Sequence, residues 1–166
     1  WHGVIESRYI LGGQPVRVTT AVHPTQDTLA VRIDSPLASE GRLRIVVAFP
    51  RGHRLDIKNT PPLDWTHPEA HTTKVTGRTT DRLELERTLD ATRFRVTVAT
   101  GGSGHVDDTA LHRHEVTVTS TGLGRLDLAL TFSPSALDAT PTATVVSTLD
   151  GPPTADRASN GDAKPT

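Results

Sequence analysis

The stretch GRLDLALTF (124–132) alternates apolar residues with others along its whole length. Its three leucines and Phe132 are spaced two residues apart, so in an extended chain they point to one face, while Asp127 points to the opposite face. A period of two is typical of a strand that has one buried and one solvated face in an antiparallel sheet. The pattern therefore predicts a β-strand whose leucines and Phe132 lie in a core.

The same alternation recurs along most of the chain. The clearest further examples are PVRVTTAVH (15–23), DTLAVRID (27–34), GRLRIVVAF (41–49) and TRFRVTVAT (92–100). Weaker strand candidates are residues 4–10, 71–76, 82–89, 113–120 and 142–149. No segment has a convincing apolar stripe at helical spacing. We therefore expect an all-β fold, an antiparallel two-sheet β-sandwich with few or no helices.

Turn-forming residues separate these candidate strands. Glycine- and proline-containing stretches lie at 11–15, 23–27, 35–41, 99–105 and 120–124. Within the fourth stretch, GGSG (101–104) is interpreted as a hairpin loop rather than a phosphate-binding motif. The last residues, LDGPPTADRASNGDAKPT, have no periodicity and are rich in Pro, Gly, Ala and Asp. We expect a sandwich domain over residues 1–149 and a linker or tail over 150–166.

Composition excludes several classes of function. The chain has 18 basic and 19 acidic residues, interspersed along its length, so we expect no nucleic-acid partner. It has no cysteine, which excludes disulfides, zinc–thiolate sites and thiol nucleophiles. No apolar run is long enough to span a membrane, and the first residues do not resemble a signal peptide. Because the chain begins with Trp1 and has no methionine, we expect a fragment of a longer protein, and its compartment stays unknown.

One polar segment, KNTPPLDWTHPEAH (58–71), carries residue types found in active sites and sugar-binding loops. Its chemistry-bearing side chains are Asp64, Trp65, His67, Glu69 and His71. Paired carboxylates would suit a glycosidase, but spacing alone places no two of them at the separation that hydrolysis needs. Trp65 could stack on a sugar ring, fill a contact between domains, or cap the core of the sandwich, and the sequence leaves these alternatives open.

His112 and His114 form the second candidate site. Two residues apart on a predicted strand, both imidazoles would point to one face, which is a workable geometry for a metal ion of a cupin-type enzyme. The third ligand is missing, however, because valine and threonine follow. We favour the interpretation that the two histidines extend the apolar face of that strand toward its rim. HPEAH (67–71) likewise lacks the HExxH order of metalloproteases, so no metal, cofactor or catalytic residue is assigned.

Three longer strings together resemble a known family. They are ESRYILGGQPVRVTTAVHPTQDTLAVRIDSPLASEGRLRIVVAFPRG (6–52), NTPPLDWTHPEAH (59–71) and RTLDATRFRVTVAT (87–100). Residues 4 to about 135 resemble the N-terminal β-sandwich of bacterial proteins in the six-hairpin glycosidase superfamily, relatives of glycoside hydrolase family 65. The resemblance implies a galactose-mutarotase-like supersandwich, followed by a linker and an (α/α)6 barrel that holds the catalytic acids. It implies no catalytic residue within this chain.

Three functions compete at this point. The favoured one is a non-catalytic accessory domain that packs on the catalytic barrel of the same polypeptide, with residues 58–71 as the contact. The second is an autonomous carbohydrate-binding module that uses Trp65, although few aromatics are available for it, since Phe49, Phe94 and Phe132 are expected in the core. The third is a cupin-type metalloenzyme at His112 and His114.

Overall fold

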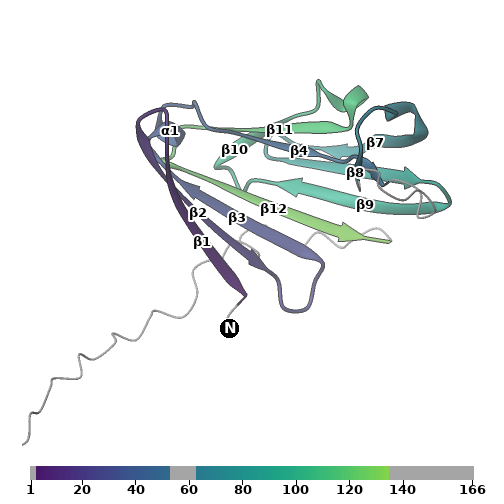
Figure 1. The fold of residues 1–166 in the computed structure, drawn as a ribbon, viewed down its shortest axis with the longest axis horizontal. Helices are drawn as coiled ribbons and strands as arrows, with labels where there is room; N and C mark the ends of the chain where they lie inside the picture. The colour runs from purple at the N-terminus through teal and green to yellow at the C-terminus, as the bar shows by residue number, and fades with distance from the viewer. Residues whose placement is uncertain (1–2, 53–62, 135–166) are drawn as a thin grey trace, which may run out of the picture.

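The computed structural model describes residues 3–52 and 63–134, which fold as an antiparallel β-sandwich (Figure 1). The larger sheet has seven strands in the order β1 (Val4–Leu11), β2 (Gln14–Val22), β3 (Thr28–Asp34), β12 (Arg125–Ser133), β9 (Thr92–Ala99), β8 (Arg82–Leu89) and β7 (His71–Arg78). The smaller sheet has three, in the order β10 (Gly104–Asp107), β11 (Glu115–Ser120) and β4 (Arg44–Ala48). The predicted fold class is thereby confirmed.

Short elements complete the described part of the chain. A two-stranded ribbon joins β5 (Arg51–Gly52) to β6 (Leu63–Asp64). The helical segments are α1 (Pro36–Ser39) and the 3-10 turns η1 (Pro68–Ala70) and η2 (Leu111–Arg113). None of these helices has the length or the apolar character that crossing a bilayer requires.

The core lies between the two sheets, because the predicted alternation turns apolar side chains of both toward each other. Leu126 and Leu128 of β12 pair with Ile33 and Val31 of β3. The two leucines belong to the same buried cluster as Val118 of β11. Figure 1 shows β4, β10 and β11 lying on one side of the larger sheet, with β1 and β7 at its two outer edges. The core therefore sits under the smaller sheet, and both outer strands of the larger sheet are edges.

Phe132 departs from the expected burial. Its Cα partner is the buried Val96 of β9, so it lies on the core face as predicted, yet it is 38% exposed. On its other side, the pairing of β12 with β3 ends at Thr131, so Phe132 has a neighbouring strand on one side only. Phe49 and Phe94 do pack against the core. All three phenylalanines therefore lie on core faces as predicted, although Phe132 remains partly exposed.

Two connections also differ from expectation. GGSG (101–104) is not a hairpin loop, because it links β9 of the larger sheet to β10 of the smaller sheet. The strand predicted over 113–120 begins at Glu115, because His114 has the left-handed backbone conformation (φ 57°) that ends η2. The strand predicted over 142–149 and the linker over 150–166 lie outside the described residues.

The crossover into the smaller sheet depends on Gly104. A Cβ at this position would lie 2.6 Å from Leu126 Cδ1 and 2.8 Å from the backbone oxygen of Thr119. The backbone oxygen belongs to the paired strand β11 and cannot rotate away. Only glycine therefore allows β10 to lie this close to β11 and to the core leucine beneath it.

We expect Gly104→Ala to lower the free energy of unfolding by about 1–3 kcal/mol, because the added methyl group overpacks this contact. Urea unfolding followed by circular dichroism measures the change. Gly52→Ala is the matched control, since a Cβ there meets no atom of the described residues within 4 Å. Equal denaturation midpoints for the two variants would contradict the assignment of Gly104 as a packing constraint.

Candidate functional site

The described part of the polar segment, residues 63–71, is here termed the Trp65 loop. It connects β6 to the edge strand β7 through η1. The structure buries the side chains of Asp64 and His71 and leaves Trp65, His67 and Glu69 exposed. The five residues proposed from sequence therefore divide into two that anchor the loop and three that face outward.

Asp64 fixes the conformation of the loop around the indole. Its Oδ1 accepts hydrogen bonds from the Thr66 N–H at 2.9 Å and from the Thr66 hydroxyl at 2.8 Å, and its Oδ2 lies 2.8 Å from His67 Nδ1. These hydrogen bonds, those from Thr66 foremost, hold the pKa of Asp64 far below its usual value. Asp64 is thus an ionised acceptor that braces the turn carrying Trp65, which is 60% exposed.

His71 and His114 stack beneath the loop. Their ring centroids are 3.8 Å apart and their planes are inclined by 31°. Nε2 of His114 lies 2.7 Å from the carbonyl oxygen of Pro68, and Nδ1 lies 2.7 Å from the hydroxyl of Thr73. Because a carbonyl can only accept, Nε2 carries the proton and donates it to Pro68. His114 thereby ties η2 to both η1 and β7.

Arg87 lies below the two histidines and is 2% exposed. Its NH1 group donates to the Thr73 hydroxyl at 2.5 Å and to the Thr72 carbonyl at 3.3 Å, and its NH2 group donates to the Phe49 carbonyl at 3.3 Å. The guanidinium carbon also lies 5.2 Å from the centroid of the Phe49 ring. Within residues 3–52 and 63–134, no carboxylate forms an ion pair with Arg87. Burial lowers its pKa.

His71 is kept uncharged by this environment. It is 7% exposed, and its Nδ1 has no hydrogen-bond partner among the described residues. Burial, followed by electrostatic interactions with His114 and with the guanidinium groups of Arg87 and Arg51, lowers the pKa of His71 to about 4, although Asp64 acts in the opposite direction. At neutral pH His71 is therefore a neutral packing residue.

A small hollow opens beside the indole. It is lined by Phe49, Pro50, Asp64, Trp65, Pro68, His71, Arg113 and His114. Asp64, the only carboxylate among these residues, already forms three hydrogen bonds. Of the two buried imidazoles, His71 is neutral and His114 is bonded to Pro68 and Thr73. These residues therefore offer no pair of carboxylates for glycoside hydrolysis. The residues around the hollow can therefore fix the shape of the loop and present the indole of Trp65 as an aromatic surface.

The metal hypothesis at His112 and His114 fails on geometry. The two residues do not share a strand: His112 lies in η2 and is exposed, whereas His114 is buried and points to Pro68 and Thr73. The interpretation that both extend the face of a strand was also wrong, because the chain turns at His114 before β11 begins. Across the described ranges, no three His, Asp or Glu side chains are grouped so that they could hold a metal ion.

Sequence reasoning missed Arg87, Thr73 and the position of His114 under the loop. A signal for Arg87 was present, because in RLELERTL it follows Leu83 and Leu85 at a spacing of two. All three side chains are buried on one face of β8. A charged residue in phase with core leucines predicts a buried, hydrogen-bonded group.

No protein-family model matches the chain, and no curated protein sequence matches it. The resemblance of residues 4–135 to the glycosidase domain stays a prediction.

The neutral state of His71 makes stability depend on pH. An unfolded chain has the ordinary histidine pKa of 6.5, whereas the folded pKa is about 4, so the unfolded state binds more protons between these values. The contribution of the neutral His71 to the free energy of unfolding is therefore complete above pH 6.5 and is lost as pH falls toward 4. The expected loss is roughly 1.4 kcal/mol per unit of pKa difference. Asp64 affects stability in a separate pH range. Because its folded pKa is lowered, its contribution to stability is lost only as pH falls below its ordinary pKa of 3.8.

We expect His71→Phe, which keeps a ring against His114 but cannot titrate, to flatten this dependence. Urea unfolding across the window between pH 6.5 and 4 measures it. The exposed His112→Phe is the control and should follow the wild-type curve. If His71→Phe and the wild type lose stability equally with acid, the assignment of a buried neutral imidazole is wrong.

Proposed function

We propose that this chain is a non-catalytic accessory domain of a carbohydrate-active enzyme, a glycoside hydrolase or a phosphorylase. In this proposal the sandwich is of the galactose-mutarotase-like supersandwich type. The Trp65 loop docks on the (α/α)6 catalytic barrel of the same polypeptide and borders its substrate cleft. The proposal combines the sequence resemblance with the structure of the loop.

The observation that carries the proposal is an exposed indole on a rigid support. Trp65 is flanked by the braced Asp64 turn and by η1, whose Pro68 carbonyl is held by His114. Ordering a loop at an interface costs free energy, and a loop already held in place avoids that cost. Tryptophan is also among the residues most enriched at the energetic centres of interfaces. A braced loop with an exposed indole suits docking.

A non-catalytic role agrees with the chemistry of the loop. Asp64 is committed to the turn, and Glu69, the other carboxylate of the loop, lies exposed in η1. Neither residue is placed in a water-excluded cleft, where a carboxyl group would be held protonated as a general acid.

A second candidate, an autonomous carbohydrate-binding module, rests on the same indole. An exposed tryptophan beside a small hollow is a surface on which a sugar ring can stack. Against it, the other exposed aromatics among the described residues are Tyr9, on β1 at the far edge of the larger sheet, and Phe132, on β12 in the middle of that sheet. The described aromatics therefore do not form one platform.

The accessory-domain proposal expects the reading frame to continue past Thr166 into a helical-hairpin domain. In that longer protein, Trp65→Ala should weaken association of the two domains by about 2 kcal/mol, because an interface tryptophan is lost. The measurement is the thermal unfolding of the catalytic domain together with kcat/KM on its glycoside substrate. Val46→Ala, which removes an exposed apolar side chain from the smaller sheet, is the control and should change neither quantity.

Isothermal titration of the 166-residue chain with a panel of oligosaccharides separates the two candidates. Saturable binding that Trp65→Ala abolishes would favour the binding module over the accessory domain. Measurable glycoside hydrolysis by the chain alone would contradict both.

A further inference from the structure

Strand β1 is an unprotected edge of the larger sheet. Among the described strands it pairs only with β2, in an uninterrupted antiparallel register, and all eight of its residues are exposed. The tight turn at Gly12 and Gly13, both with positive φ, fixes that register. Several β1 side chains are large and apolar, with Ile10 68% exposed. A long, regular, apolar edge of this kind is a template for a further strand.

The opposite edge of the same sheet is protected. Strand β7 carries a register irregularity between Val75 and Gly77, and Lys74 lies beside it. Bulges and lysines are devices that prevent edge-to-edge pairing. The contrast within one sheet singles out β1 as the edge that remains free to pair.

The sequence of β1, VIESRYIL, is self-complementary about Ser7. If β1 of a second copy lies antiparallel with Ser7 opposite Ser7, then Glu6 lies opposite the partner's Arg8. In the same register Ile5 faces the partner's Tyr9, and Val4 faces the partner's Ile10. Opposite charges and aromatic–β-branched pairs are both favourable when directly opposed across strands.

Backbone geometry leaves few alternative registers. In an antiparallel pair every second residue turns its N–H and C=O groups toward one neighbour, so permitted registers differ in steps of two residues. A register centred on Glu6 would oppose Glu6 to itself, and one centred on Arg8 would oppose Arg8 to itself. Of the three central registers, only the one about Ser7 joins opposite charges.

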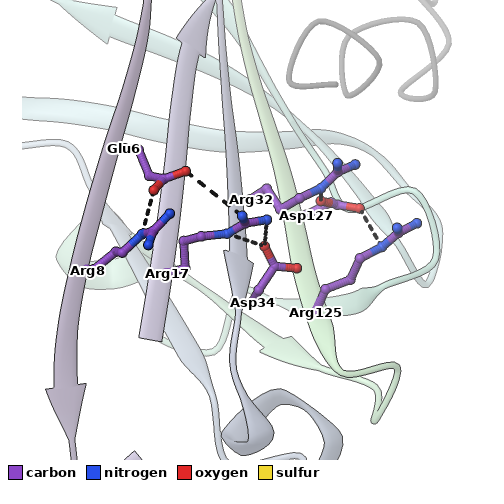
Figure 2. Close-up of polar contacts among 7 residues, drawn as sticks. All are labelled: Glu6, Arg8, Arg17, Arg32, Asp34, Arg125 and Asp127. Carbon is purple, nitrogen blue, oxygen red and sulfur yellow. Dashed lines mark hydrogen bonds and ion pairs between the residues drawn. The ribbon is translucent and has the colours of Figure 1, made fainter. Parts of the chain in front are cut away.

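A ladder of charges on one sheet face leads to this edge (Figure 2). Arg32 of β3 lies 2.8 Å from Asp127 of β12, and Arg17 of β2 lies 3.0 Å from Asp34 of β3. Arg17 also lies 3.9 Å from Glu6 of β1, and beyond β1 the described structure places no further strand. At the edge, Glu6 bonds to Arg8 of its own strand at 2.6 Å. A second copy would continue the ladder with the partner's Arg8 as the next cation.

We propose that the chain forms a two-fold symmetric dimer in which β1 pairs antiparallel with the partner's β1 about Ser7. The two larger sheets then become one continuous sheet, and the charged faces of both copies lie on the same side. The strand that pairs with β1 is β1 of a second copy rather than an unrelated strand. The reason is that residues 4–10, in the order apolar, apolar, acidic, Ser, basic, apolar, apolar, are complementary to themselves. The interface lies at the sheet edge opposite β7, so it leaves the Trp65 loop free.

Charge exchange tests the proposal on the full 166-residue chain by sedimentation velocity and light scattering at micromolar concentrations. The wild type is expected to be a dimer. Glu6→Arg and Arg8→Glu each oppose like charges twice in the symmetric interface, so each should weaken the dimer roughly tenfold or more. The double variant Glu6→Arg/Arg8→Glu restores both pairs and should dimerise as the wild type does.

A mixture of the two single variants tests the proposed register most specifically. An equimolar mixture of the Glu6→Arg and Arg8→Glu variants should form a heterodimer, because every like-charge contact becomes an opposite-charge contact. Lys74→Glu on β7 is the matched control and should leave the dimer unchanged. A monomeric wild type, single variants that dimerise as well as the wild type, or a mixture that stays monomeric would each overturn the proposal. Circular dichroism verifies that every variant is folded.

Discussion

The end of the sandwich that carries the candidate site depends on the buried guanidinium group of Arg87, which no carboxylate of the described residues pairs with. Arg87 projects from β8 and binds backbone or side-chain oxygens of β7 and of the segment that follows β4. These segments belong to different parts of the chain and to both sheets. Nε of Arg87 is buried and has no hydrogen-bond partner among the described residues, so the charge depends on the acceptors of its two terminal nitrogens. Because burying a charge with unmet donors is costly, these acceptors must stay in place. Arg87 therefore constrains the positions of Phe49, Thr73 and, through Thr73, His114.

The loop geometry follows from that constraint. With Thr73 and His114 in place, the His114 imidazole reaches the Pro68 carbonyl, and His71 stacks on it as a neutral ring. Asp64 then braces the turn before η1, and the indole of Trp65 is left as the exposed part of a rigid assembly. At the other edge of the same sheet, no described strand pairs with the outer side of β1, and the sequence of β1 is complementary to itself. The two surfaces lie on opposite edges, so a docking contact and a dimer contact are compatible.

Much of the fold could be predicted from the sequence, because a period of two is a local property of each strand. Burial at strand ends could not be predicted in this way: Phe132 is in phase with Leu130, but its exposure depends on where β3 ends. The link at 101–104 looked like a hairpin because turn residues mark a change of direction without saying which sheet the next strand joins.

The candidate site was predicted in composition but not in arrangement. The sequence identified Asp64, Trp65 and His71 through their residue types, and the partners of Asp64 lie within the same segment. The groups that support the loop from beneath come from elsewhere: His114 follows η2, Arg87 belongs to β8 and Phe49 follows β4. The sequence predicted His114 on a strand, because no residue in LHRHEV indicates the left-handed backbone conformation that places His114 under the loop. Long-range contacts of this kind are absent from local patterns, and here they decide which side chains are buried.

Native-state hydrogen exchange of Arg87→Met measures whether Arg87 organises this end of the sandwich. If Arg87 organises this end of the sandwich, amides of residues 64–73 and 111–114 should exchange faster in the variant, while those of β1, β2 and β3 keep their wild-type protection. Arg82→Met, on the same strand but paired with Glu84 near the surface, should leave both regions unchanged. Unaltered exchange in residues 64–73, or a uniform loss of protection across both sheets, would show that Arg87 does not organise this end of the sandwich.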